Sequence, residues 1–318
     1  MRNVILVFLF IFLSGTAYAH EFFVNAGVTQ DTKTSTARLQ WSTTYLQELG
    51  DHLAFSFSYI NEGHQVNHYR DGIAGQVWGR AGVWHRNLVF GLGVGPYAYF
   101  DTNGDANGSF HDQHGFAALF SGTATLYALS PLLFQARINY LAASHSFNTL
   151  SGTIGIGYEL GVDKQPTGTP AGEGVGALKN EITAYTGVTV LNTQKNEQGT
   201  SWALEYRRSL VPYLEWTATG LWEGADKPVA RYGLMSQVWL THPFFTDHLT
   251  LSAGFGPYLA HDRYQQGTDD KTKLDWAASF SASIRFLEHF AVRGSWSRII
   301  TTQDRDTDVF LAGLSYRF

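Results

Sequence analysis

Hydrophobic and polar residues alternate along almost the whole of this chain, and the alternation predicts β-strands. It is clearest over residues 53–62, 88–100 and 275–285. Because successive side chains of a strand point to opposite faces of the sheet, each segment has one apolar face and one face of small or polar residues. In 88–100 the apolar face carries Leu88, Phe90, Leu92, Val94 and Phe100, and the other face carries Gly91, Gly93, Gly95, Tyr97 and Tyr99.

The connections between these strands alternate between short and long. Tight connections fall at Ser130-Pro131, near Val211-Pro212 and at Glu288-His289, whereas long ones are expected over 61–72, 101–115, 192–199 and 261–273. Short turns at one end and long loops at the other are typical of outer-membrane barrels, whose apolar side chains face lipid. A soluble β-sandwich with a wet outer face is the alternative. Aromatic residues near the strand ends favour the barrel, because they suit girdles at the two membrane interfaces: Tyr140, Trp216, Trp222, Phe244, Phe245 and Trp296.

The last strand, 310–318, alternates and ends on Phe318. It resembles the C-terminal signal by which Gram-negative outer-membrane β-barrel proteins are recognised for assembly. The resemblance covers this strand specifically and the rest of the chain only in pattern, and it points to no characterised subfamily. It implies an outer-membrane location, contact with outer-membrane lipid and lipopolysaccharide, and recognition of the strand by the barrel assembly machinery.

A long stretch of the chain occurs twice, since 62–101 recurs without a gap as 223–262. A fixed internal repeat sets the architecture, and here the repeating unit is as large as a domain. The recurring residues are Glu62, Gly63, Arg70, Gly72, Gln76, Val77, Trp78, Gly93, Gly95, Pro96, Tyr97 and Asp101, found again as Glu223, Gly224, Arg231, Gly233, Gln237, Val238, Trp239, Gly254, Gly256, Pro257, Tyr258 and Asp262.

The N-terminus predicts export. Arg2 precedes a short apolar run and the small residues Ala17-Tyr18-Ala19, so 1–19 reads as a signal peptide cleaved after Ala19. There is no cysteine, so neither disulfides nor thiolates contribute. Charged residues are scarce and the net charge is -5, which argues against a nucleic-acid partner. No motif indicates a cofactor or a metal site.

These signals predict an all-β transmembrane antiparallel barrel protein with about sixteen strands in two homologous halves. The expected parts are the first eight-strand repeat over 20–160, a flexible periplasmic linker over 161–180 and the second repeat over 181–318. The predicted inner faces mix small residues, aromatic rings and a few charges. This composition suits two filled eight-stranded barrels, and one sixteen-stranded barrel is the alternative.

The densest cluster of candidate functional residues lies in the first half, in a segment expected to be an outer loop. It comprises His64, His68 and Asp71, and His111 and His114 belong to the next expected loop. Imidazoles and carboxylates at one rim can ligate a metal or act as general bases. The second half lacks these residues but keeps Glu223 and Arg231, so Glu62–Arg70 and Glu223–Arg231 are expected to be structural ion pairs.

One further segment, 144–148, looks superficially like the His-x-Ser-Asn element of lipid A 3-O-deacylases. Its histidine and serine are adjacent, and no asparagine follows the serine directly, so no catalytic residue is carried over. The sequence therefore favours a non-enzymatic barrel with an envelope structural role, a binding role or a role as a porin-like pore for small solutes or glycans. The alternative is an outer-leaflet enzyme that modifies lipopolysaccharide through the histidine-rich loops.

Overall fold

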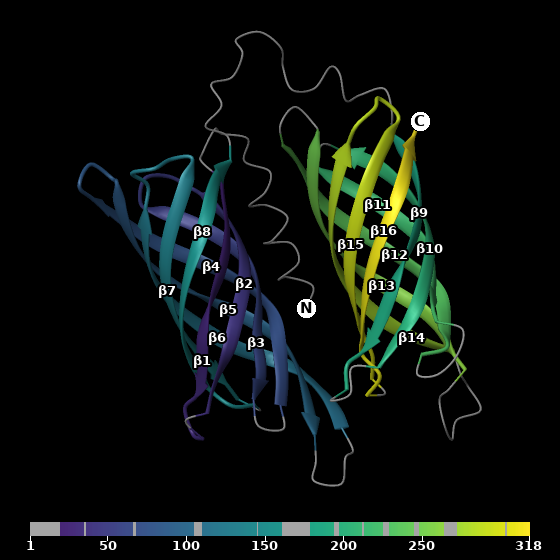
Figure 1. Ribbon diagram of the computed structural model, residues 1–318, viewed down its shortest axis with the longest axis horizontal. Helices are drawn as coiled ribbons and strands as arrows, with labels where there is room; N and C mark the ends of the chain where they lie inside the picture. The colour runs from purple at the N-terminus through teal and green to yellow at the C-terminus, as the bar shows by residue number, and fades with distance from the viewer. Residues whose placement is uncertain are drawn as a thin grey trace. The chain divides into compact units, whose positions relative to one another are not determined.

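The computed structural model describes residues 20–34, 36–65, 68–104, 110–144, 146–160, 179–193, 197–211, 213–224, 229–244, 248–263, 272–302 and 304–318. The expected signal peptide and nearly all of the expected linker lie outside these residues. Within them the protein is all-β, with sixteen strands in two closed barrels of eight, each drawn in Figure 1. No helix in this part of the chain is long and apolar enough to cross a membrane.

The first barrel follows chain order throughout, and it closes where β1 pairs with β8. Every pairing with a described register is antiparallel, as short connections between consecutive strands require. Its strands are β1 (His20–Asp31), β2 (Ala37–Glu48), β3 (Leu53–Gln65), β4 (His68–Val83), β5 (Leu88–Gly104), β6 (Phe110–Leu126), β7 (Leu132–Ala143) and β8 (Thr149–Leu160).

The second barrel has the same order, and it closes where β16 pairs with β9. At this seam the last residue, Phe318, exchanges backbone hydrogen bonds with Asn180. Its strands are β9 (Asn180–Leu191), β10 (Gln198–Val211), β11 (Leu214–Glu223), β12 (Arg231–Phe244), β13 (Leu249–Asp262), β14 (Thr272–Arg285), β15 (Phe290–Ile300) and β16 (Thr307–Arg317). The prediction of two eight-stranded barrels is confirmed, and the single sixteen-stranded barrel is excluded.

The alternation of residue types sorts side chains between the outside and the interior. On β5, Phe90, Leu92 and Val94 are 49%, 77% and 51% exposed, whereas Tyr97 and Tyr99 are buried. The other strands repeat this split, with apolar residues outside and serine, threonine and charged residues inside. A closed barrel has no free strand edge, so it satisfies its backbone hydrogen bonds without water.

Each interior is packed around one tryptophan. The Trp78 ring is 2% exposed, and its Nε1 donates to Ser56 Oγ at 2.7 Å. In the second barrel Trp239 is 1% exposed and donates to Thr217 Oγ1 at 2.9 Å. Glycine on the neighbouring strand makes room for each ring, because a Cβ at Gly93 would lie 2.6 Å from Trp78. Side chains thus fill the interior of both barrels, as eight strands permit.

Two of the expected long loops, 61–72 and 101–115, are mostly strand. Residues 61–72 were expected to form a long loop, but β3 runs to Gln65 and β4 starts at His68, so strand pairing continues almost to the tip. His64, His68 and Asp71 therefore lie on strands, as do His111 and His114 on β6. The physical reason is that antiparallel strands keep their backbone hydrogen bonds as far as a tight hairpin tip allows, whatever the polarity of their side chains.

Candidate functional site

A buried ion pair lies at one end of the first barrel, here called the mouth, where the connections after β1, β3, β5 and β7 lie. Arg70 Nε donates to Glu62 Oε2 at 2.5 Å, and Nη2 donates to Oε1 at 3.1 Å. Thr149 Oγ1 adds a hydrogen bond to Glu62 at 2.5 Å, and Arg70 Nη1 donates to the Phe147 carbonyl at 2.5 Å. This bidentate pair ties the β3–β4 hairpin to the connection between β7 and β8.

The mouth of the second barrel, where the connections after β9, β11, β13 and β15 lie, repeats this arrangement. Arg231 Nε and Nη2 donate to Glu223 Oε1 and Oε2 at 2.7 and 2.8 Å. Thr307 Oγ1 donates to Glu223 at 2.6 Å, and Arg231 Nη1 donates to the Arg305 carbonyl at 3.2 Å. Thr149 and Thr307 therefore hold equivalent positions.

The two mouths differ at a carboxylate near the end of the fifth strand of each barrel, Asp101 on β5 and Asp262 on β13. In the first barrel Asp101 receives hydrogen bonds from His68 Nδ1 at 3.1 Å and from Ser146 Oγ at 2.8 Å. In the second barrel Asp262 receives one from Arg305 Nε at 2.7 Å. The first mouth thus carries an imidazole and a hydroxyl where the second mouth has a permanent cation.

His68 is the predicted candidate that contacts this carboxylate. Its side chain is 34% exposed, and its ring packs edge-on against Phe147 with centroids 4.9 Å apart. A carboxylate on Nδ1 fixes the tautomer and orientation of an imidazole and leaves Nε2 for other partners. The cluster of His68, Asp101 and Ser146 can therefore bind a polar group that approaches the mouth.

The cluster does not have the hydrogen-bond order of a serine hydrolase. In that order the serine hydroxyl donates to the imidazole, and the carboxylate holds the other ring nitrogen. Here Ser146 Oγ donates to Asp101 and accepts from Arg70 Nη1 at 2.9 Å. The hydroxyl proton is therefore directed at a carboxylate, and the imidazole does not activate it.

The other predicted residues lie in separate surroundings. Asp71 is buried and accepts a hydrogen bond from Tyr59 at 2.6 Å, which suits a structural role. His111 and His114 are exposed on β6, and the His114 ring lies against Phe100 with centroids 5.7 Å apart. The side chain of His64 is outside the described part of the structure. No group of three or more histidines, aspartates and glutamates in the described residues is placed to hold a metal ion.

A second polar cluster, not anticipated from sequence, closes the opposite end of the first barrel. Arg80 donates to Glu48 Oε1 at 2.8 Å, to Glu21 Oε1 at 3.1 Å and to the Tyr127 hydroxyl. Tyr127 Oη in turn donates to Glu21 at 2.6 Å. Burial and then the negative charge of Glu21 raise the pKa of Tyr127, so its hydroxyl stays a proton donor. Only the pairing register brings these four residues together, so no local motif reveals them.

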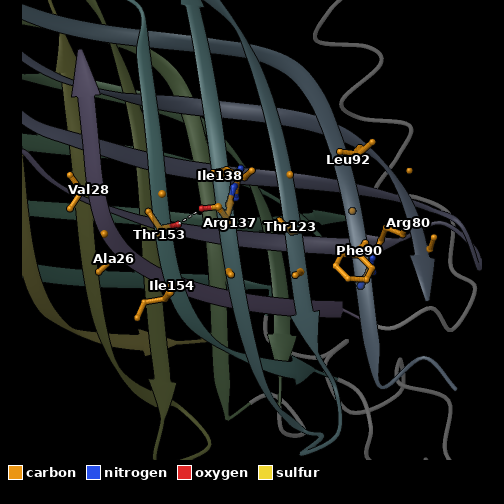
Figure 2. A pocket seen from close by; sticks show the side chains of 18 of the residues that line it. Ala26, Val28, Arg80, Phe90, Leu92, Thr123, Arg137, Ile138, Thr153 and Ile154 are labelled. Carbon is orange, nitrogen blue, oxygen red and sulfur yellow. Dashed lines mark hydrogen bonds between the residues drawn. The ribbon is translucent and has the colours of Figure 1, made fainter. Parts of the chain in front are cut away.

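The outer wall of the first barrel offers hydrocarbon contacts and little else. A hollow runs along β1, β8, β7, β6, β5 and β4 (Figure 2). Its apolar side chains point outward and are 49% to 77% exposed, while glycine and alanine lie between them. An exposed apolar surface of this extent around a polar interior requires a lipid solvent. The outward side chains are Val28, Phe90, Leu92, Ile138 and Ile154.

Both units are closed, eight-stranded antiparallel β-barrels with an apolar outer wall. No family model and no curated protein matches this chain. Among solved structures, the N-terminal β-barrel domain of Pseudomonas aeruginosa OprF aligns at 14% identity over 45% of this chain and 100% of its own, with a TM-score of 0.37. Neisserial surface protein A aligns at 10% identity over 45% and 97%, with a TM-score of 0.36. A Pseudomonas aeruginosa FadL homologue aligns at 11% identity over 95% and 90%, with a TM-score of 0.25.

Proposed function

We propose that this protein is a non-conducting, non-enzymatic outer-membrane barrel protein with a structural or binding role in the cell envelope. The observation that carries the proposal is that both interiors are filled. Trp78 and Arg137 in the first barrel, and Trp239 and Arg207 in the second, are at most 3% exposed. An interior filled at this level leaves no continuous aqueous path for solutes or glycans.

In this proposal the mouth of the first barrel is the binding site. Exported barrels place their longer loops outside the cell, and in the second barrel the connections at the mouth are the longer ones. The first mouth is its equivalent in the repeat, so in this proposal both mouths face outward. Of the two, the first presents the half-exposed His68 imidazole, held by Asp101. Such a group can donate to or accept from the polar head of an outer-leaflet lipid such as lipopolysaccharide. The second mouth closes the equivalent position with Arg305, so it acts as the structural partner.

Conductance tests the proposal directly. The refolded mature protein in planar bilayers should give no current steps, while a porin of known size serves as the positive control in the same lipid. Steps of porin size from the whole protein would overturn it. Binding is tested separately by titrating purified lipopolysaccharide against the wild type and His68→Val, the residue that the second barrel carries as Val229. Equal affinity of the two would remove the mouth as the binding site.

A second candidate is an outer-leaflet enzyme that modifies lipopolysaccharide. The observation that favours it is the contact of Asp101 with both His68 and Ser146. For this candidate, lipid A from membranes containing the wild type must differ in mass from that of His68→Ala and Ser146→Ala. Identical lipid A profiles would leave the non-enzymatic proposal standing.

Assembly is the last element of the proposal. β16 is the strand that closes the second barrel, and its final residues pair with β9. We infer that the assembly machinery recognises this strand through Phe318 and that export follows cleavage after Ala19. Deleting Phe318 should lower the folded, heat-modifiable fraction in the outer membrane, and an unchanged fraction would contradict this inference.

A further inference from the structure

One arginine inside the first barrel has no carboxylate partner among the residues that the structure describes. Arg137, on β7, is 3% exposed. It donates to Gln76 Oε1 at 2.6 Å, Asn139 Oδ1 at 2.7 Å and Thr44 Oγ1 at 3.0 Å, all of which are neutral. Taking a charge out of water costs several kcal/mol when no opposite charge compensates it. Neutral hydrogen bonds offset only part of that cost.

In the second barrel the buried arginine over the tryptophan has a carboxylate partner. Arg207 lies over the Trp239 ring at 4.4 Å, as Arg137 lies over Trp78 at 5.3 Å. Arg207, however, comes from β10 and forms an ion pair with Glu205 at 3.0 Å. The cation over the tryptophan is thus present in both barrels, while the adjacent carboxylate is present in the second alone.

Strand pairing shows what replaces that carboxylate. On β2, the residue two positions before Thr44 pairs with Asn25, and on β10, the residue two positions before Glu205 pairs with Tyr185. Thr44 therefore holds the place of Glu205, and Asn25 holds the place of Tyr185. The first barrel has a short neutral side chain at each of these positions.

A glycine on the adjoining strand supports this equivalence. A Cβ at Gly155 would lie 2.1 Å from Asn25 Oδ1, and a Cβ at Gly313 would lie 2.6 Å from Tyr185 Cδ1. In both barrels the side chain from the first strand therefore lies over a glycine of the last strand. The Tyr185 hydroxyl extends from there to Glu205 Oε1 at 3.4 Å, whereas asparagine is shorter by the length of the phenol ring.

The shorter side chain leaves buried polar atoms without partners. Asn25 is 0% exposed, and neither its Nδ2 nor its Oδ1 has a hydrogen-bond partner among the described residues. A buried amide that lacks partners is destabilising, so native proteins normally satisfy it. Asn25 pairs with the residue two positions before Thr44, so these two buried side chains are neighbours on the inner face, and Arg137 Nη1 donates to Thr44 Oγ1.

We propose that the first barrel binds a small monovalent anion, of the size of chloride, between the Arg137 guanidinium and the Asn25 amide. The anion supplies the negative charge that Glu205 supplies in the second barrel, and it accepts hydrogen bonds from the two donors. The second barrel does not bind it, because its own carboxylate and tyrosine occupy the equivalent place. This inference does not depend on the proposed function.

Anion-dependent stability tests the proposal on the full-length protein. Unfolding by urea is followed in lipid vesicles at equal ionic strength in sodium chloride and in sodium gluconate, whose anion is too large for the site. Ligand that binds only the folded state raises stability with concentration. We expect the unfolding midpoint to rise with the logarithm of the chloride concentration once it exceeds the dissociation constant. Equal midpoints in the two salts would overturn the proposal.

Two variants assign the effect to the site. Arg137→Gln keeps neutral hydrogen bonds but removes the charge, and it should abolish the chloride dependence. Thr44→Glu supplies a carboxylate as the second barrel does, and it should also abolish the dependence while raising the midpoint in gluconate. If Arg137→Gln does not fold, Thr44→Glu still decides the matter. Chloride dependence that persists in Thr44→Glu would contradict the site.

Discussion

Arg305 Nε donates to Asp262 Oδ2 at 2.7 Å, and the first barrel has no such contact because Phe147 holds the position of Arg305. The equivalence follows from the backbone, since Arg70 and Arg231 donate to the carbonyls of these two residues. The differences between the repeats, which include Phe147 for Arg305 and His68 for Val229, therefore replace a fixed ion pair by a carboxylate that binds an imidazole and a serine. The two barrels serve as internal controls for each other.

Transplanting the second mouth into the first tests this relationship. In the variant His68→Val with Phe147→Arg, the new guanidinium should pair with Asp101. We expect a coupling energy of about 1 kcal/mol between residue 147 and Asp101 in a double-mutant cycle with Asp101→Asn, measured by urea unfolding. The same cycle with Phe147 retained is the control, and a coupling energy of zero would show that the mouths are not equivalent.

Breaking the buried ion pair of a mouth should lower the free energy of unfolding substantially. Glu223→Gln leaves Arg231 buried without its charge partner, so we expect unfolding to require about 3–5 kcal/mol less free energy. The double variant Glu223→Gln with Arg231→Met removes the uncompensated charge and should recover part of this loss. A loss below about 1 kcal/mol for the single variant would mean that the pair is solvated.

The tryptophan packing predicts unequal effects of alanine at two glycines of the first barrel. At Gly93 a Cβ would lie 2.6 Å from the buried Trp78 ring, so Gly93→Ala should destabilise by about 1–3 kcal/mol. Gly79 faces outward with nothing within 4 Å, and Gly79→Ala should change stability by less than about 0.5 kcal/mol. Equal effects in urea unfolding would mean that the interior is loosely packed.

The polar cluster at the closed end of the first barrel makes a further prediction. Tyr127→Phe removes the hydroxyl that donates to Glu21 and accepts from Arg80. The remaining carboxylate keeps Arg80 as a partner, so we expect a loss of about 1–2 kcal/mol in the free energy of unfolding. Tyr213→Phe, at an exposed turn of the second barrel, is the control and should have no effect. Equal losses in the free energy of unfolding for both variants would mean that the cluster does not stabilise the barrel.

Local patterns in the sequence were sufficient to predict the fold. Alternation assigned Leu92 to the outside and Tyr97 to the inside, and the mixture of small and aromatic inner residues indicated eight strands per barrel. Connection length was less informative, because backbone pairing extends through His68, where polarity alone suggested a loop.

The candidate site was only partly predictable. His68 could be selected because the second repeat lacks it, and the repeat also marked Glu62 with Arg70. The contact of Ser146 with Asp101 could not be predicted, because the two residues come from different parts of the chain and pairing registers determine which of these meet. The amide of Asn25 could not be chosen either, because burial without partners depends on what the opposite strands supply.

Each half of the chain forms a barrel that closes on itself, β1 against β8 in the first and β9 against β16 in the second. Each half should therefore fold without the other. The most direct measurement is refolding of the halves His20 to Gln165 and Leu178 to Phe318 as separate chains in lipid vesicles, followed by electrophoresis with and without heating. We predict that each half alone gives a compact, heat-modifiable band. Halves that stay unfolded apart and fold when mixed would contradict the account.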